Sequence, residues 1–550
     1  MDETFDFVVV GSGGGSMCAG LVLREAGKSV LILEKTDLVG GSTARAGGVM
    51  WVPNNRFMRA EGIADSRENA ATYMDAVVGA QSHDSPGTSA ERRQTYIDEA
   101  PRMIDFLVEQ GIKLGRGPDW PDYYDERPGG VERGRTVVPD LFNINELGPW
   151  REKLRPNHIK VAAPMADLFK LTLYKRSWRG RVALMKTGLR LSIAKVTGKK
   201  WEVGGAALQG RMLQQALARG IEIRLDSPVL EVIEENGVVV GVVAGSAKGP
   251  KRIGARLGVL LNAGGFAQNQ QMRDQYMPGT RAEWTHTAPG DTGDMHREMI
   301  RIGAAMGQMD EMVGCQMTCP PGMGPLAVQQ QLGKPHAFLV DQTGVRYMNE
   351  GGSYMAFCQQ VMERNRTVPA VPSWMIFDSE FVASYMLAST MPGTTKPQKW
   401  FDEKFLHRAD TVAELAMLLG IDPAVLNATV ERFNGFAKRG VDEDFGRGKR
   451  AYDRFLGDFT HRPNKALGMV AKGPFYAMPI VPGDVGTFGG VITDCSARVL
   501  RQDGSVIRGL YATGTTTASV MGRAYPGAGS SIGPSFTWGF VAARHALGRN

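Results

Sequence analysis

The sequence predicts an α/β fold in which a second domain is inserted into the first, and three features lead to this prediction. Glycine is overrepresented, with 69 residues in 550 against a usual level of about 7%. An apolar strand pattern, a glycine-rich turn and a helix pattern open the chain. Similar small-residue turns recur near residues 40, 264 and 514. Because such turns bring backbone close to a ligand, segments from both ends of the chain are expected to build one binding domain.

The first element is a strand over residues 5–10 (FDFVVV), followed by a turn at 11–16 (GSGGGS), a helix over 17–26 and a second strand over 29–33. This order predicts the dinucleotide-binding βαβ unit of a Rossmann-like domain, in which the turn and the helix N-terminus approach a pyrophosphate. An acid should bind the ribose hydroxyls, and Glu34 lies 23 positions after Gly11. The residues expected to bind the nucleotide here are Gly11, Gly13, Gly14, Gly15, Ser16, Glu34 and Lys35, with Ser16 in the position of the third glycine.

The later turns favour FAD over NAD as the nucleotide. GGSTARAGG follows directly after the second strand, and such a loop suits a flavin, whose flat ring needs backbone close to it. A third turn follows an apolar strand at 260–266, and a fourth precedes the C-terminal segment. The flavin-binding residues expected from these turns are Gly41, Ser42, Thr43, Gly47, Gly48, Ala263, Gly264, Gly514, Ser530 and Ile532.

The amino-acid composition narrows the possible classes of protein further. The chain is 43% hydrophobic and 22% charged, which is typical of a globular protein with a large core. Its five cysteines are scattered without a C-x-x-C pair, so neither a disulfide framework nor a metal site is expected. No apolar run approaches the roughly 18 residues of a membrane span. We therefore expect a cytoplasmic protein, with a net charge of +7 that clusters in one segment.

That segment is residues 168–201, where ten Lys or Arg residues and no acid occur between 170 and 200. An apolar stripe recurs at helical spacing through Tyr174, Trp178, Val182, Met185, Leu189, Ile193 and Val196. A basic amphipathic helix predicts contact with an anionic membrane surface, at the inner face of the membrane. The alternative is that the stripe packs onto the body of the protein and leaves a solvated basic face. Nucleic acid is not an expected partner, because no fold that recognises it accompanies the charge.

The motifs together resemble the fumarate reductase and succinate dehydrogenase flavoprotein family, and more closely its 3-ketosteroid Δ1-dehydrogenase branch. The resemblance covers almost the whole chain. Its marks are GSGGGS, GGSTARAGG, PDYYDERPGG (121–130), GDTGDMHREMIRIGA (290–304), GVRYMNEGGSY (344–354), GPFYAMPIVPGDVGTFGGVITD (473–494) and YATGTTTASVMGRAYPGAGSSIGP (511–534). The histidine that attaches FAD in succinate dehydrogenases is absent, so the cofactor is expected to be bound non-covalently.

The resemblance implies four catalytic positions. Tyr354 matches the general base, and Tyr123 matches the tyrosine that supports this base. Tyr525 and the backbone N–H of Gly529 match the groups that bind the substrate carbonyl. Because a free tyrosine has a pKa near 10, Tyr354 needs help to act as a base at neutral pH, and Arg346 and Arg523 are candidates for a nearby positive charge.

The expected function is therefore removal of hydrogens from C1 and C2 of a 3-ketosteroid, with electrons passing from FAD to an external acceptor such as a quinone. The alternatives are a 3-ketosteroid Δ4-(5α)-dehydrogenase, a fumarate-reductase-like flavoprotein and a flavin-bearing binding protein without turnover. Fumarate reductases typically have a histidine before a glycine pair that helps to bind the dicarboxylate. This chain has Thr487 and Phe488 before that pair, which disfavours the fumarate-reductase-like alternative. The expected domain limits are 1–278 and 470–550 for FAD and 279–469 for an inserted α+β catalytic domain.

Overall fold

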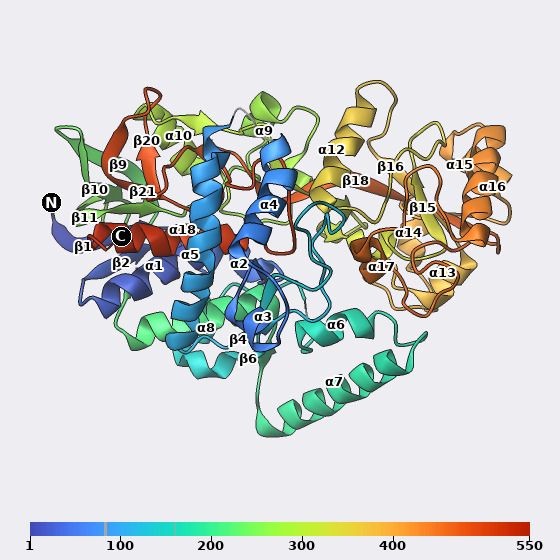
Figure 1. Cartoon of the computed structure of the whole chain (residues 1–550), viewed down its shortest axis with the longest axis horizontal. Helices are drawn as coiled ribbons and strands as arrows, with labels where there is room; N and C mark the ends of the chain where they lie inside the picture. The colour runs from blue at the N-terminus through green and yellow to red at the C-terminus, as the bar shows by residue number, and fades with distance from the viewer. Residues whose placement is uncertain (82–84, 160, 550) are drawn as a thin grey trace.

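The computed structural model describes residues 1–81, 85–159 and 161–549. Its largest sheet has eight strands, on the left of Figure 1, and it combines parallel and antiparallel pairs. The strand β1 runs parallel to β2 and to β11. The bounds are β1 Glu3–Val10, β2 Val30–Leu33, β8 Glu222–Arg224, β9 Val229–Glu235, β10 Val238–Ala244, β11 Lys251–Leu261, β20 Arg498–Leu500 and β21 Val506–Ala512. Strands from both ends of the chain share this sheet, as the recurring turns predict.

Helices α1 (Gly14–Glu25) and α18 (Ile532–Ala546) pack against each other beside the large sheet. Their contact is so close that a Cβ on Gly539 of α18 would lie 2.3 Å from the Gly15 carbonyl oxygen. Also part of this half are α2 Gly41–Arg45, α3 Arg56–Ala60, α4 Arg67–Val77, α5 Ala90–Glu109, α8 Gly204–Ala218, α9 Gln270–Tyr276 and α10 Asp294–Arg301. Short strand pairs and a three-stranded sheet complete it: β3 Met50–Trp51, β4 Leu114–Arg116, β5 Thr136–Pro139, β6 Phe142–Asn143, β7 Trp201–Glu202, β12 Met306–Gly307 and β19 Gly490–Val491.

A second sheet of six strands lies on the right of Figure 1. It comprises β13 Met312–Thr318, β14 Leu326–Ala327, β15 Ala337–Val340, β16 Ser373–Asp378, β17 His407–Ala409 and β18 Phe475–Thr487. Its helices are α11 Gln329–Leu332, α12 Tyr354–Asn365, α13 Ser379–Ser384, α14 Gln398–Asp402, α15 Val412–Leu419, α16 Pro423–Arg439 and α17 Ala451–Leu456. Residues 475–487 thus pair with the inserted sheet, while the domain limits given above stay a prediction.

The basic segment folds as two helices, α6 (Met165–Leu171) and α7 (Trp178–Thr197), at the lower edge of the molecule in Figure 1. The apolar stripe of α7 faces outward, because Trp178 is 70% and Leu189 is 64% exposed. Small residues form its buried face instead. The alternative in which the stripe packs onto the body of the protein is therefore wrong. Among the described residues, no helix has both the length and the apolar character needed to cross a membrane.

Candidate active site

The predicted nucleotide turn lies between β1 and α1, where its geometry requires glycine. Gly11 has a φ of +92°, and a Cβ there would lie 2.3 Å from the carbonyl oxygen of Asn262 at the end of β11. Gly14 and Gly15 are equally confined by Phe536 and Ser535 of α18. Ser16 is accommodated because its hydroxyl accepts a hydrogen bond from the Asn262 side chain at 2.9 Å. Gly11 and Gly13 line a cavity, whereas Gly14, Gly15 and Ser16 shape the turn from behind.

The acid predicted to bind ribose lies at the carboxyl end of β2. The carboxylate of Glu34 accepts hydrogen bonds from Ser12 on the turn and from the backbone and side chain of Thr36. These contacts fix the carboxylate at the wall of the same cavity. Lys35 also lines the cavity, but its ammonium group is engaged by Asp294 at 2.6 Å.

The second predicted loop forms α2, whose backbone closes another side of the cavity. Gly48 has a φ of +70°, and a Cβ there would lie 2.4 Å from the backbone of Gly204 in α8. The Ser42 hydroxyl accepts a hydrogen bond from the Ala288 N–H at 2.9 Å. Around Gly41 the nearest atom to a Cβ is 3.9 Å away, so backbone here faces open space.

All these segments line one cavity of about 760 Å³. The remaining predicted residues that line it are Gly41, Ser42, Thr43, Gly47, Gly48, Ala263, Gly264, Gly514 and Ile532. Ser530 does not line it, because its hydroxyl bonds to the backbone of Gly527 and holds the C-terminal turn in shape. A glycine cradle, two helix N-termini and a carboxylate at the end of β2 fit a dinucleotide, and the residues present therefore fit FAD.

Three tyrosines, Tyr123, Tyr354 and Tyr525, also line the cavity, and Tyr452 packs against Tyr123. We call these four residues the tyrosine cluster. The ring centroids of Tyr354 and Tyr525 lie 4.7 Å apart, and those of Tyr123 and Tyr354 lie 5.3 Å apart. Interaction with Tyr354 opposes the rise in the pKa values of Tyr525 and Tyr123. The structure thus brings together the three tyrosines that the resemblance implied.

Tyr525 and Gly529 converge on one point. The backbone N–H groups of Gly529 and Ser531 lie beside the Tyr525 hydroxyl and oppose the rise of its pKa. Gly529 has a φ of +99°, and a Cβ there would lie 2.5 Å from the Met50 Cα in β3. Glycine is therefore required at position 529 by the close approach of β3. A ligand oxygen that reached the Gly529 N–H would also be within reach of the Tyr525 hydroxyl.

Burial governs the ionisation of the tyrosine cluster. It raises the pKa of Tyr525 to about 12, and it raises the pKa values of Tyr354 and Tyr123 well above their ordinary value. The two arginines expected to oppose this effect are engaged elsewhere. Arg346 is bound by Glu350 and Asp442 and Arg523 by Asp310 and Glu311, so neither supports Tyr354 as the sequence suggested.

Tyr452 is a member of the cluster that the sequence did not indicate. Its ring stacks on Tyr123 at 4.2 Å, and its hydroxyl accepts a hydrogen bond from the Gln329 side chain at 2.8 Å. Tyr452 lies on α17, whose first N–H groups are held by the carboxylate of Asp125. Because Asp125 belongs to the motif PDYYDERPGG, that motif positions two tyrosines at once.

Tyr123 is itself fixed by contacts on both sides. Its backbone N–H donates to the carbonyl of Pro526, directly after Tyr525. The neighbouring Asp122 is buried and binds Arg135 at 2.9 Å, and Arg135 also binds Asp65. The segments 121–130 and 525–530, remote in sequence, are therefore locked together.

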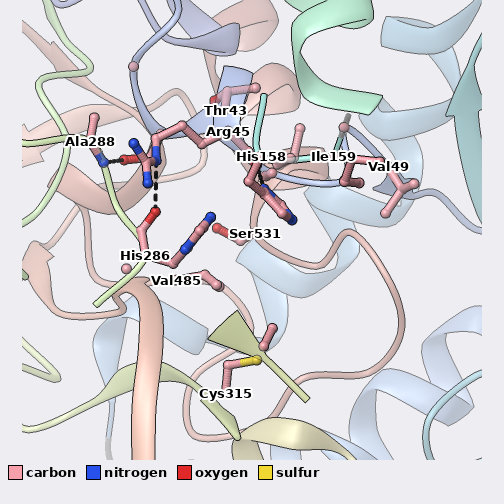
Figure 2. A pocket seen from close by; sticks show the side chains of 18 of the residues that line it. Thr43, Arg45, Val49, His158, Ile159, His286, Ala288, Cys315, Val485 and Ser531 are labelled. Atoms are coloured by element: carbon pink, nitrogen blue, oxygen red, sulfur yellow. Dashed lines mark hydrogen bonds between the residues drawn. The ribbon is translucent and has the colours of Figure 1, made fainter. Parts of the chain in front are cut away.

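A pair of histidines on the cavity wall was also not predicted as part of the site. The rings of His158 and His286 lie 4.5 Å apart, and the Arg45 guanidinium donates to the His286 carbonyl (Figure 2). Burial, His158 and Arg45 lower the pKa of His286 to about 4. His286 is thus neutral at physiological pH. Cys315 lines the cavity nearby, with a pKa that burial raises to about 12.

The fold and this cavity define the class of the protein as a FAD-binding flavoprotein. The family described as FAD binding domain matches residues 6–532. The chain is 39% identical to the 3-oxosteroid 1-dehydrogenase of Mycobacterium tuberculosis (strain H37Rv), over 99% of this chain and 98% of that protein. It is 38% identical to the enzyme of the same name from Mycolicibacterium smegmatis, over 98% and 97%.

A solved structure gives the same result. The 3-ketosteroid Δ1-dehydrogenase from Sterolibacterium denitrificans, in complex with 1,4-androstadiene-3,17-dione, superimposes with a TM-score of 0.93 at 34% identity, covering 99% of this chain and 100% of that one. The chain belongs to the 3-ketosteroid Δ1-dehydrogenase family of FAD-binding flavoproteins. The resemblance inferred from the motifs is confirmed, as are the fold class and FAD as cofactor.

Proposed function

We propose that this protein oxidises 3-ketosteroids by removing hydrogens from C1 and C2. The observation that carries the proposal is the convergence of Tyr354, Tyr525 and the Gly529 N–H in an apolar part of the cavity that also holds the nucleotide-binding turns. Relatives with the name 3-oxosteroid 1-dehydrogenase support it. A saturated C–C bond resists dehydrogenation unless an adjacent carbonyl acidifies one C–H, which explains the need for a ketone-binding pair.

Tyr525 and Gly529 would bind the ketone oxygen at C3. As the C2 proton leaves, negative charge develops on this oxygen, and two donors aligned in advance stabilise it. In the free chain these two groups lie side by side. Arrival of the carbonyl would therefore place its oxygen within reach of two donors that are already arranged.

Tyr354 would take the C2 proton. Its raised pKa means that the side chain is a neutral phenol before reaction, so its hydroxyl must give up its own proton as it accepts the one from C2. Tyr123, whose ring lies 5.3 Å from that of Tyr354, would receive this proton and pass its own hydroxyl proton to Tyr452, and Tyr452 would release one proton to solvent water. Bound FAD supplies the acceptor for the hydride from C1.

The test is Tyr354→Phe in the FAD-loaded protein. We expect turnover to fall by about 10²–10⁴-fold, the usual contribution of general acid–base catalysis, while the yellow flavin remains bound. Tyr347→Phe is the matched control, because it deletes a tyrosine hydroxyl that bonds to Ser373 at 2.7 Å outside the cavity. Equal activities of the two variants would exclude Tyr354 as the base.

Product analysis with 5α-androstane-3,17-dione separates the alternatives. A new double bond between C1 and C2 supports the proposal, whereas one between C4 and C5 indicates a Δ4-(5α)-dehydrogenase. Fumarate-dependent oxidation of the reduced flavin would indicate the fumarate-reductase-like alternative. The absence of the expected histidine before Gly489, where Phe488 and Thr487 stand, disfavours that outcome.

We also propose that electrons pass from the flavin to an external acceptor such as a quinone, and that the protein acts in the cytoplasm at the inner face of the membrane. The exposed apolar stripe of α7 supports the second point. Reoxidation of the substrate-reduced protein by a short-chain menaquinone analogue, under anaerobic conditions, tests the first.

A further inference from the structure

Helix α7 presents large apolar side chains to solvent along its whole length. Trp178, Met185, Leu189, Ile193 and Val196 are between 52% and 88% exposed. With about 3.6 residues per turn, these five positions fall on one face of the helix. Single exposed apolar residues are common on protein surfaces, but a continuous stripe marks an interaction site.

The opposite face of α7 is built for attachment to the protein. Its buried residues are small: Gly180, Ala183, Thr187 and Ala194. A Cβ on Gly180 would lie 2.7 Å from the carbonyl oxygen of Lys170 in α6, so the two helices touch closely there. The Arg190 guanidinium also donates to the Ala162 carbonyl at 3.1 Å. These contacts fix the rotation of α7, and the stripe faces outward because of them.

Basic residues flank the stripe on both sides. At 100° per residue, Arg179 and Lys186 fall on one side of it and Arg181 and Lys195 on the other. There is no acid between residues 170 and 200. This surface therefore complements a partner surface that carries negative charge and has apolar groups directly beneath that charge. A second copy of the same face would bring like charges together, so self-association is disfavoured.

The same segment forms part of the wall of the substrate cavity. Leu168, Phe169 and Leu171 of α6 line it, and so do Leu184 and Thr187 of α7. The linker between these helices is fastened to the inserted domain, because Arg176 binds the buried carboxylate of Asp458 at 3.0 Å. The outward stripe and the apolar cavity therefore lie on two sides of one thin layer of protein.

We propose that α7 docks on an anionic lipid bilayer, with its stripe at the boundary of headgroups and acyl chains, and that an apolar ketone passes between the bilayer and the cavity beside α6 and α7. The inference of docking depends only on the surface of α7. The passage of the ketone rests on the proposed function.

Docking is tested by co-sedimentation of the FAD-loaded protein with two kinds of vesicle. One contains phosphatidylcholine alone, and the other also contains about 30% phosphatidylglycerol, which is anionic. We expect binding to the anionic vesicles that weakens as salt rises. The variant Met185→Glu/Leu189→Glu/Ile193→Glu should bind at least about tenfold more weakly. The variant Arg181→Gln/Lys186→Gln/Lys195→Gln should lose about a hundredfold in affinity for anionic vesicles, since each basic residue contributes roughly a factor of five.

Met417→Glu/Leu418→Glu is the matched control, because these residues of α15 are 63% and 55% exposed on another face. This control should bind as the unchanged protein does. Absence of binding to anionic vesicles, or equal binding by the stripe variant, overturns the proposal. A dimer in sedimentation that the stripe substitutions dissociate would assign the surface to a second copy instead.

Passage of the ketone is tested by supplying androst-4-ene-3,17-dione either in vesicles or in cyclodextrin. The stripe variant should turn over vesicle-borne steroid at least about tenfold more slowly and cyclodextrin-borne steroid at the normal rate. Equal rates from both sources would refute passage from the bilayer. If no steroid were oxidised at all, the proposed function would fail while the vesicle result still decided the docking.

Discussion

Replacing Tyr525 by phenylalanine removes one of the two groups that we propose bind the ketone oxygen. The phenol is 4% exposed, and its hydroxyl lies beside the backbone N–H groups of Gly529 and Ser531. Phenylalanine keeps the ring, which packs 4.7 Å from Tyr354 and 6.0 Å from Phe488. The substitution therefore deletes a donor without emptying the space.

Two magnitudes follow from these contacts. Loss of one such donor raises the barrier by about 2.7–4 kcal/mol, so kcat should fall by about 10²–10³-fold. In the substrate-free state, the substitution removes a buried hydroxyl from beside two backbone N–H groups, and loss of one such polar contact costs about 1 kcal/mol of stability. The variant should thus unfold at a lower temperature as well.

The assay is anaerobic reduction of bound flavin by androst-4-ene-3,17-dione, followed in a stopped-flow spectrometer and normalised to flavin content. Calorimetry measures the stability change separately, with Tyr347→Phe as the control that loses a single hydroxyl contact elsewhere. Retention of more than about a tenth of the unchanged rate would refute the role of Tyr525, because that loss is smaller than any single-donor effect expected here.

Three further predictions concern the cofactor loop, a buried ion cluster and pH. Gly48→Ala should lower both flavin content and Tm, measured by absorbance and calorimetry, because its Cβ would lie 2.4 Å from Gly204 at a φ of +70°; normal flavin content would contradict this. Arg135→Met should cost about 3–5 kcal/mol, since it leaves the buried carboxylates of Asp65 and Asp122 without their cation; a Tm within a degree or so of the original would argue against it. Burial raises the pKa values of the tyrosine cluster, so the folded chain keeps protons that the unfolded chain releases near pH 10. The Tm should therefore fall as pH rises from about 10 towards 12, and fall less in Tyr452→Phe; identical profiles would exclude this cause.

The nucleotide-binding half of the fold could be predicted because its signals are local. A buried strand, a glycine turn and a helix are consecutive in the chain. The glycines of the turn indicate positions where the backbone needs glycine, as the positive φ of Gly11 shows. The helices α15 and α16 carry a similarly local signal, because α15 ends at Gly420, which lies in the left-handed region.

The active site was predictable only through motifs, and the reason is physical. Tyr123, Tyr354 and Tyr525 come from segments that are far apart in the sequence, and no local periodicity relates them. Tyr452 was missed because it lies in no recognised motif, although Asp125 connects it to one. The arginines were misjudged because nearness in sequence to Tyr354 and Tyr525 does not reveal which carboxylates bind them.

The orientation of α7 illustrates a different limit. The helical spacing of its apolar residues correctly predicted the helix and the stripe. An apolar stripe alone, however, does not indicate whether it faces the protein or the solvent. The deciding signal was the opposite face, where Gly180, Ala183 and Ala194 are small enough for close helix contact.

The central claim is that the tyrosine cluster and the flavin act together on carbons 1 and 2 of a 3-ketosteroid. The most direct measurement mixes the FAD-loaded protein with androst-4-ene-3,17-dione without oxygen, follows flavin absorbance and identifies the steroid formed. The account predicts bleaching of the flavin with one equivalent of androsta-1,4-diene-3,17-dione. Persistence of the yellow colour with this and every other 3-ketosteroid, or bleaching with a double bond elsewhere in the ring system, would contradict it.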